Sequence, residues 1–292
     1  MSDHYALIGH PLRFSLSPAI QVAAFRALGL DADYVLRPTP AAALPAELDA
    51  LRDGRFCGAN VTVPHKRAAL NLAEAAGDLA VGLGAANTLV REPDGSLRAE
   101  NTDAAGFAVQ LAGLGLAAGA GRRALVLGAG GAARAVAYAL LEAGYKVTVA
   151  ARSSAQSAVL AATLNRLQGG ADLSTAWLQP EHLAIALAGA DLLVNTIPEG
   201  AADHEDDKPL PHGLPFGDRL NAVIDIVAWP LETALVRRAR AEGRLAAGGL
   251  DMLLGQAAAS FHLWTDRPAP HEIMRQAALE AAARRAAAEA GT

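Results

Sequence analysis

The 292-residue chain contains a single cysteine, Cys57. One thiol cannot form an internal disulfide, which favours a reducing compartment. Aromatic residues are also scarce, at 4%, although hydrophobic residues as a group reach 52% and charged residues only 19%. This composition supports a large core and excludes an intrinsically disordered chain.

An excess of positive charge and long apolar runs are missing as well. The net charge is −5 and no basic stripe is present, which argues against nucleic acid as the main partner. The first residues, MSDHYALIGHPL, lack a basic segment followed by an apolar run, so we expect no signal peptide. No segment reaches the roughly 20 unbroken apolar residues of a membrane span. The sequence predicts a cytoplasmic protein with no membrane partner and no metal site.

The first third of the chain alternates strand-like and helix-like segments. Apolar strands are expected at 5–9, 33–38 and 59–63, and the period of residues 66–84 predicts one helix. Residues 87–101 read as a hairpin around a Pro-Asp-Gly turn. This alternation predicts a mainly parallel sheet.

After Ala105 a second α/β unit is predicted. Its apolar strands are expected at 123–128, 145–152, 174–178, 191–197 and 222–227. Helical segments separate most of them, which is typical of a doubly wound sheet. Residues 199–218 are polar and rich in proline and glycine and predict an exposed loop; its acidic run, 202–207, has no functional interpretation. Two further helices end the chain.

A glycine-rich turn joins the first of these strands to a helix. Gly128, Ala129, Gly130, Gly131, Ala132 and Ala133 match G-x-G-x-x-A. Glycines permit the tight turn and let a pyrophosphate approach the helix N-terminus. In an alanine-rich chain the match can also arise by chance, but its place between a strand and a helix favours dinucleotide binding.

The type of dinucleotide is read after the next strand. An Asp or Glu there usually binds the ribose hydroxyls of NAD. This chain instead has Arg152 and Ser153 after Ala151. An arginine can pair with a 2′-phosphate, so the sequence favours NADP, with NAD as the alternative. The competing interpretation is an ordinary solvent-facing arginine.

Two charged residues are candidates for proton transfer. Oxidation of an alcohol needs a base for the hydroxyl proton, and Lys66 stands just past a buried strand. Asp103 follows the hairpin, where the second unit begins, and could orient both the lysine and a hydroxyl group. From spacing alone, both can equally be solvated charges at strand ends.

Several motifs, in order from about residue 5 to residue 264, resemble the shikimate dehydrogenase family. They are FSLSP (14–18), GANVTVPHK (58–66), GAANT (84–88), ENTDAAGF (100–107), GAGGAAR (128–134), NTIPEG (195–200) and GLDMLLGQAAASFHLW (249–264). The resemblance implies an α/β protein of two domains. Residues 1–104, completed by 246–292, would bind substrate, and residues 105–245 would form a Rossmann-type NADP domain to which the C-terminal helices do not belong.

The resemblance also implies an activity and a set of site residues. The activity is the reversible NADP-dependent oxidation of shikimate to 3-dehydroshikimate, on the pathway to chorismate and the aromatic amino acids. The implied catalytic residues are Lys66 and Asp103. The implied substrate ligands are Ser15 and Ser17 for the carboxylate and Asn60, Thr62, Asn87 and Gln256 for the hydroxyls. The implied cofactor residues are Asp78, Gly128, Ala129, Gly130, Gly131, Ala132, Arg152, Ser153, Ile226 and Gly249.

Three departures from the family pattern keep alternatives open. Ala228 stands where a tyrosine is common, which bears on the choice of ring acid. Ala151 and Gln156 stand where an asparagine and a second cation are usual, which weakens the preference for NADP. The third departure is the acidic run at 202–207. The alternatives are a quinate/shikimate dehydrogenase that uses NAD and a cofactor-binding regulator without catalysis. A monomer and a homodimer are both compatible with the sequence.

Overall fold

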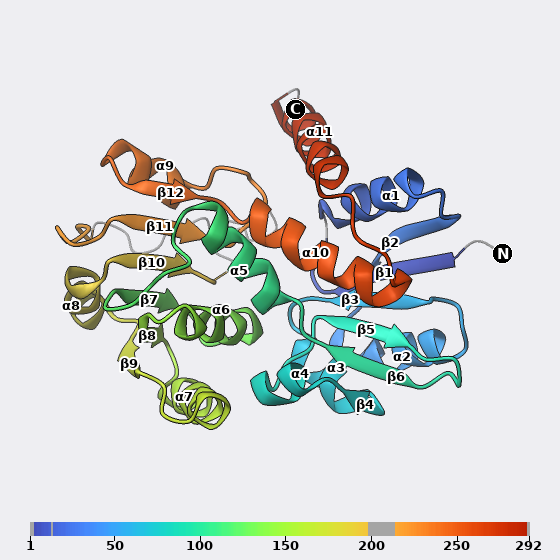
Figure 1. Ribbon diagram of the computed structural model, residues 1–292, viewed down its shortest axis with the longest axis horizontal. Coiled ribbons are helices and arrows are strands. Elements are labelled where there is room, and N and C mark those ends of the chain that lie inside the picture. Colours follow the sequence, from blue (N-terminus) through green and yellow to red (C-terminus); the bar gives the residue numbers. More distant parts are fainter. Residues whose placement is uncertain (1–2, 13, 198–213, 291–292) are drawn as a thin grey trace. The chain divides into compact units, whose positions relative to one another are not determined.

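The computed structural model describes residues 3–12, 14–197 and 214–290 (Figure 1). It divides into two compact units: residues 1–106 with 253–292, and residues 107–252. The acidic run at 202–207 lies outside the described residues. Within the described part of the chain, no helix is long and apolar enough to span a membrane.

The first unit contains a six-stranded mixed sheet in the order β2-β1-β3-β5-β6-β4. Its strands are β1 (Asp3–Gly9), β2 (Ala32–Pro38), β3 (Gly58–Val61), β4 (Ala75–Ala76), β5 (Thr88–Arg91) and β6 (Leu97–Glu100). β1 runs parallel to β2 and β3, but β5 is antiparallel to both β3 and β6. The sheet is therefore less parallel than expected, because the predicted hairpin joins it directly as two of its strands.

The first unit also contains helices. They are α1 (Ser17–Ala27), the short 3-10 helix η1 (Ala41–Ala43), α2 (Leu44–Arg52), α3 (Lys66–Leu72), α4 (Asp78–Leu83) and α11 (His271–Ala290). Two more helices, α5 (Asp103–Gly113) and α10 (Leu250–Thr265), contain the points where the chain leaves the first unit and returns to it. α11 lies beside α1, so the end of the chain belongs to the first unit (Figure 1). The apolar side chains of α2 pack with those of β1 and β3 in the core.

The prediction of a single helix at 66–84 is wrong. The segment forms α3 and α4, with the two-residue strand β4 between them. The backbone N–H groups of Glu74 and Gly77 donate to carbonyl groups of β6 at 3.1 and 3.0 Å. Pairing with a strand distant in sequence therefore overrides the local helical period.

The strand before Lys66 is also shorter than expected. β3 ends at Val61, and Val63 is 53% exposed. Thr62 still donates its backbone N–H to Ile8, and the chain then turns, with the N–H of His65 bonded to the carbonyl of Thr62. Lys66 is the first residue of α3, directly after this turn.

The second unit contains an all-parallel sheet in the order β12-β11-β10-β7-β8-β9. Its strands are β7 (Arg123–Leu127), β8 (Lys146–Ala151), β9 (Leu173–Trp177), β10 (Leu192–Asn195), β11 (Ala222–Asp225) and β12 (Leu245–Ala247). The helices α6 (Gly131–Glu142), α7 (Ser154–Gln168), α8 (Pro180–Gly189) and α9 (Ala234–Ala241) connect them. This strand order is that of the doubly wound dinucleotide-binding fold, which confirms the predicted fold class.

The order of the strands reverses between β7 and β10. In sheets of this kind ligands bind outside the carboxyl ends of the strands at such a switch point. The central strands β7, β10 and β11 are almost fully buried, and Leu125, Leu127 and Leu193 pack with side chains of α8 and α9. The buried strands thus form a rigid support for the loops at their carboxyl edge.

Candidate active site and dinucleotide site

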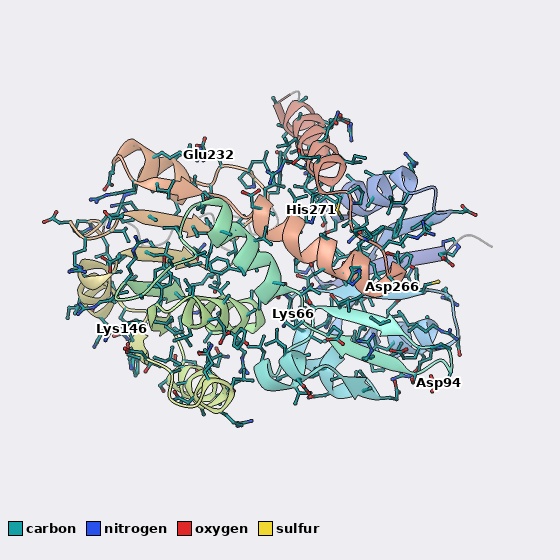
Figure 2. The ribbon with its side chains drawn as sticks, viewed as in Figure 1. Lys66, Asp94, Lys146, Glu232, Asp266 and His271 are labelled. Atoms are coloured by element: carbon teal, nitrogen blue, oxygen red, sulfur yellow. The ribbon has the colours of Figure 1, made fainter. Side chains whose placement is uncertain are left out.

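Lys66, labelled in Figure 2, forms an ion pair with Asp103 in the first unit. Its Nζ donates to Asp103 Oδ2. Their side chains are only 14% and 7% exposed. β3 and β6 run in the same direction because each is antiparallel to β5. Their carboxyl ends therefore lie at one edge of the sheet, and α3 and α5 begin there with Lys66 and Asp103.

Asn87 holds the other oxygen of the aspartate. It precedes β5, whose amino end lies at the same edge of the sheet. Its Nδ2 donates to Asp103 Oδ1 and to Thr102 Oγ1, both at 2.8 Å, and its Oδ1 accepts from the backbone N–H of Thr102 at 2.7 Å. Both carboxylate oxygens of Asp103 thus have partners, which fixes the orientation of this carboxylate.

A buried polar network continues from Asn87 toward α10. Gln256 Oε1 accepts from Asn87 Nδ2 at 3.3 Å. Ser260, one turn further along α10, contacts Asn60 at 2.9 Å, Thr88 at 2.8 Å and Thr102 at 3.1 Å through its hydroxyl. Ser260 was not among the sequence-predicted site residues. Its spacing of four from Gln256 on one helix was the available signal.

Tyr34 is a second member of the network that the sequence interpretation missed. Its hydroxyl donates to Asn60 Oδ1 at 2.9 Å. Desolvation by burial raises the pKa of Tyr34 above its usual value, and a hydrogen bond with Ser17 acts in the opposite direction. Tyr34 therefore stays neutral and connects Ser17 to Asn60. Nothing in the order of residues on β2 distinguishes it from an ordinary core tyrosine.

The serine pair lies at the start of α1. Ser15 Oγ accepts the backbone N–H of Ser17 at 3.1 Å. Ser17 is the first helical residue and is only 5% exposed. The structure thus brings Ser17, Asn60, Asn87, Gln256, Lys66 and Asp103 into one network of contacts.

Two predicted residues stand apart from this network. Thr62 lies in the turn before α3, where its side chain packs closely against Gly9. Asp78 is the exposed first residue of α4. Neither side chain is hydrogen-bonded to the network among the described residues.

The glycine turn of the second unit has the features that a pyrophosphate requires. Gly128 follows β7 with φ +106°, and a Cβ there would lie 2.7 Å from Thr196 Oγ1, so a side chain would be strained. A Cβ on Gly130 would meet open space. Gly130 precedes α6, whose first turn has no side-chain cap. The N–H groups of that turn are therefore open to an anion, and the residues fit a dinucleotide phosphate.

Arg152 and Ser153 follow β8 at the same carboxyl edge of the sheet. Arg152 is exposed and forms no ion pair with a described residue. Ser153 caps α7, because its Oγ accepts the backbone N–H of Gln156 at 3.3 Å. Because Arg152 forms no ion pair with a described residue, its guanidinium group is free to bind an anion near the start of α7.

Ile226 and Gly249 are in direct contact. A Cβ on Gly249 would overlap the carbonyl oxygen of Ile226, and the N–H of Gly249 donates to the carbonyl of Val227 at 2.9 Å. Only glycine allows the two backbone segments to approach this closely.

Asp225 supports this contact, although the sequence interpretation did not select it. Its carboxylate is 1% exposed and accepts from Thr233 Oγ1 at 2.7 Å, Asn195 Nδ2 at 3.0 Å and the N–H of Val227 at 3.2 Å. Desolvation by burial raises the pKa of Asp225, and these three hydrogen bonds act against that effect. Asp225 thus fixes the start of the segment that contains Ile226.

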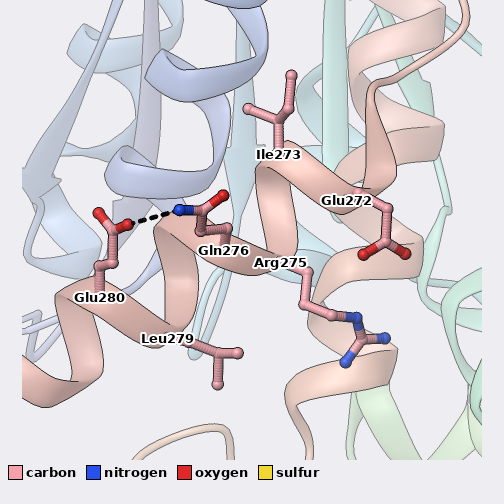
Figure 3. A pocket seen from close by; sticks show the side chains of 6 residues that line it. All are labelled: Glu272, Ile273, Arg275, Gln276, Leu279 and Glu280. Atoms are coloured by element: carbon pink, nitrogen blue, oxygen red, sulfur yellow. Dashed lines mark hydrogen bonds between the residues drawn. The ribbon is translucent and has the colours of Figure 1, made fainter.

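A hollow of about 480 Å³ lies along α11 (Figure 3). The described residues that line it are Glu272, Ile273, Arg275, Gln276, Leu279 and Glu280. All six belong to one helix, and none is a predicted site residue. We therefore place neither substrate nor cofactor there.

The parallel sheet with its glycine turn and the lysine–aspartate pair in its polar network define a dinucleotide-dependent oxidoreductase. A relative from Salinibacter ruber, named shikimate dehydrogenase (NADP(+)), is 42% identical over 274 residues, covering 93% of this chain and 95% of that protein. The chain belongs to the shikimate dehydrogenase family. The family's substrate binding domain matches residues 7–89, and the Shikimate 5′-dehydrogenase C-terminal domain matches residues 249–279.

Solved structures agree with this assignment. Shikimate 5-dehydrogenase from Thermus thermophilus, in complex with NADP(H) and shikimate, is 38% identical, with a TM-score of 0.81 over 96% of this chain and 99% of that one. Quinate dehydrogenase from Corynebacterium glutamicum, in complex with NAD, is 31% identical, with a TM-score of 0.82 over the same shares. The two relatives have similar folds, but one is named for shikimate and was solved with NADP(H), and the other is named for quinate and was solved with NAD.

Proposed function

We propose that the protein catalyses the reversible oxidation of shikimate to 3-dehydroshikimate with NADP, a step toward chorismate and the aromatic amino acids. The observation that supports this most strongly is the Lys66–Asp103 pair, with Asn87 on the second carboxylate oxygen. The Thermus relative, whose structure contains both shikimate and NADP(H), supports the same substrate and cofactor.

Lys66 and Asp103 divide the proton chemistry between them. In the oxidation direction the neutral amine of Lys66 accepts the proton of the substrate hydroxyl, and in the reverse direction the ammonium group returns it. Asp103 accepts hydrogen bonds only, so it orients Lys66 and the substrate hydroxyl while Asn87 holds it in place. When bound, NADP would supply the hydride acceptor for the carbon that carries this hydroxyl.

Polar side chains of the first unit bind the rest of the substrate. Ser15 and Ser17 bind the carboxylate at the start of α1, where the helix dipole favours an anion. Asn60, Thr62, Asn87 and Gln256 hold the ring hydroxyls. Asn60 and Asn87 already hydrogen-bond to other protein groups, so their amides are oriented before substrate arrives.

Residues of the second unit bind the cofactor. The turn of Gly128, Ala129, Gly130, Gly131 and Ala132 holds the pyrophosphate at the start of α6. Arg152 and Ser153 bind the adenosine phosphate, and Ile226 and Gly249 lie beside the nicotinamide. Asp78 is assigned to the cofactor through the family resemblance alone.

A second candidate function is quinate oxidation with NAD. Ala228 cannot donate the hydroxyl hydrogen bond of the tyrosine common at this position, and Gln156 supplies no second cation for a 2′-phosphate. The likeness to the quinate dehydrogenase of Corynebacterium glutamicum points the same way. The retained Arg152 and the absence of an acid after β8 favour NADP over this candidate.

Steady-state assays with both ring acids and both dinucleotides test the proposal. We expect the highest kcat/KM for shikimate with NADP. Arg152→Ala should weaken NADP by about 10-fold, the lower end for a charge-assisted hydrogen bond, and leave NAD nearly unchanged. A higher kcat/KM for quinate with NAD in the wild-type enzyme would establish the second candidate instead.

A further inference from the structure

Trp177 is a large aromatic side chain in an unusual position. It is the last residue of β9, the edge strand of the second sheet, and it is 49% exposed. Its indole has no hydrogen bond or ring contact with any other residue that the structure describes. Single exposed apolar side chains are common on protein surfaces, so the exposure of Trp177 assigns it no function by itself, and its position in the sheet is what matters.

The register of the sheet places Trp177 beside the proposed cofactor residues. It pairs with Ala151, the last residue of β8, and the N–H of Leu178 donates to the carbonyl of Ala151 at 3.0 Å. Arg152 is the next residue after Ala151. Trp177 therefore lies at the carboxyl edge of the sheet, one strand away from the arginine assigned to the adenosine phosphate.

The orientation of the strands also identifies the face on which Trp177 lies. Ala150 and Ala176 are paired and pack with the core cluster that contains Leu183 of α8. Side chains alternate between faces along a strand, so Ala151 and Trp177 share the opposite face. The side chain of Trp177 is therefore not part of the core on the α8 face.

We propose that Trp177 binds the adenine ring of NADP by stacking. The strands β7, β8 and β9 form one mononucleotide-binding half of the fold, and the 2′-position of the adenosine ribose is read at the end of β8. A base attached to that ribose needs an apolar surface nearby, and Trp177 is an exposed aromatic one on the adjacent strand. This inference rests on the cofactor site proposed above and adds a residue to it.

The contact strengthens binding of either dinucleotide, because adenine is common to both. It supports Arg152 and Ser153, which bind the 2′-phosphate. It also offsets the missing second cation at Gln156, because stacking adds affinity without charge.

Adenosine 2′,5′-bisphosphate, which resembles the adenosine end of NADP, is the probe. Its affinity for wild-type enzyme, Trp177→Ala and Trp177→Phe is measured by calorimetry. Trp177→Ala should weaken binding by about 5- to 10-fold, the lower end for loss of one base–aromatic stack, because the indole is half exposed. Trp177→Phe should bind close to wild type. Ile185→Ala, which removes another exposed apolar side chain of the same unit, should change nothing.

Tryptophan fluorescence supplies a second readout. The bisphosphate should quench the wild-type signal, and the quenching should disappear in Trp177→Phe although Trp229 and Trp264 remain. Equal affinity in wild type and Trp177→Ala would overturn the role of Trp177. Failure of the wild-type enzyme to bind the bisphosphate would instead overturn the cofactor site itself.

Discussion

Lys66 occupies its position because Asp103 binds it, and Asp103 keeps its orientation because Asn87 binds the second oxygen. This chain of contacts predicts a specific kinetic effect. Lys66→Ala should lower kcat by roughly 10²- to 10⁴-fold, the usual contribution of acid–base catalysis, with a smaller change in KM. Steady-state kinetics of shikimate oxidation measure this split.

A matched control for Lys66→Ala is Lys146→Ala. Lys146, labelled in Figure 2, is 56% exposed and pairs with Asp172 at 2.9 Å on the surface. Its removal should leave kcat and KM unchanged, because surface ion pairs contribute little. Turnover near wild type in a folded Lys66→Ala variant would contradict the proton-transfer role.

Because the pKa of Asp225 is raised in the folded protein, we expect the stability of the protein to depend on pH. Burial raises its pKa in the folded state above the usual value of 3.8, so the unfolded chain gives up this proton at lower pH than the folded protein. Stability therefore falls as pH rises from 3.8 through the folded pKa. Asp225→Asn has no carboxylate to ionise. Its free energy of unfolding, relative to wild type, should thus increase across that window.

Urea unfolding at a series of pH values between about 4 and 7 measures this difference. The variant Asp218→Asn, at an exposed aspartate, controls for the change in net charge. A constant difference between Asp225→Asn and wild type across the series would refute the expected contribution of Asp225.

At the scale of elements, the connection from β12 to α10 depends on Gly249. A Cβ there would overlap the carbonyl oxygen of Ile226, after β11. Gly249→Ala should therefore lower the free energy of unfolding by about 1–3 kcal/mol, as overpacking usually does, and weaken NADP binding. Chemical denaturation and cofactor titration measure the two effects.

Gly113→Ala is the matched control in the same unit. Gly113 is exposed in α5, and a Cβ there would have no neighbour within 4 Å. Alanine should leave stability unchanged or raise it by up to about 1 kcal/mol, because it restricts the unfolded chain. An equal change in the free energy of unfolding in Gly249→Ala and Gly113→Ala would contradict the role given to the close backbone approach at Gly249.

At the scale of the whole molecule, the two compact units predict separate responses to the two ligands. Shikimate should slow amide hydrogen exchange mainly in the first unit, at residues 58–66 and 101–106. NADP should slow it mainly in the second unit, at residues 128–133 and 150–156. Ligand binding suppresses local opening of the segments that it contacts. Exchange followed by mass spectrometry, with each ligand alone, tests this; protection by shikimate confined to the second unit would reverse the assignment.

Part of the fold follows from local sequence. Strands β7 to β11 of the second unit were predicted, because buried parallel strands are continuous apolar runs and Gly128 marks the turn between β7 and α6. The short edge strand β12 and helix α9 were not predicted. Family motifs pointed to Lys66 and Asp103 before any geometry was known. Such signals depend on short-range periodicity and on residue types that one position requires.

The tertiary structure alone decided the rest. β4 interrupts the expected helix at 66–84 because β6 offers it backbone partners, and the hairpin β5–β6 makes the first sheet mixed. Tyr34, Asp225 and Ser260 have ordinary sequence neighbours and became site residues only through contacts with distant segments. The physical reason is that burial and hydrogen-bond partners are properties of the folded chain. No local pattern encodes which distant groups will meet.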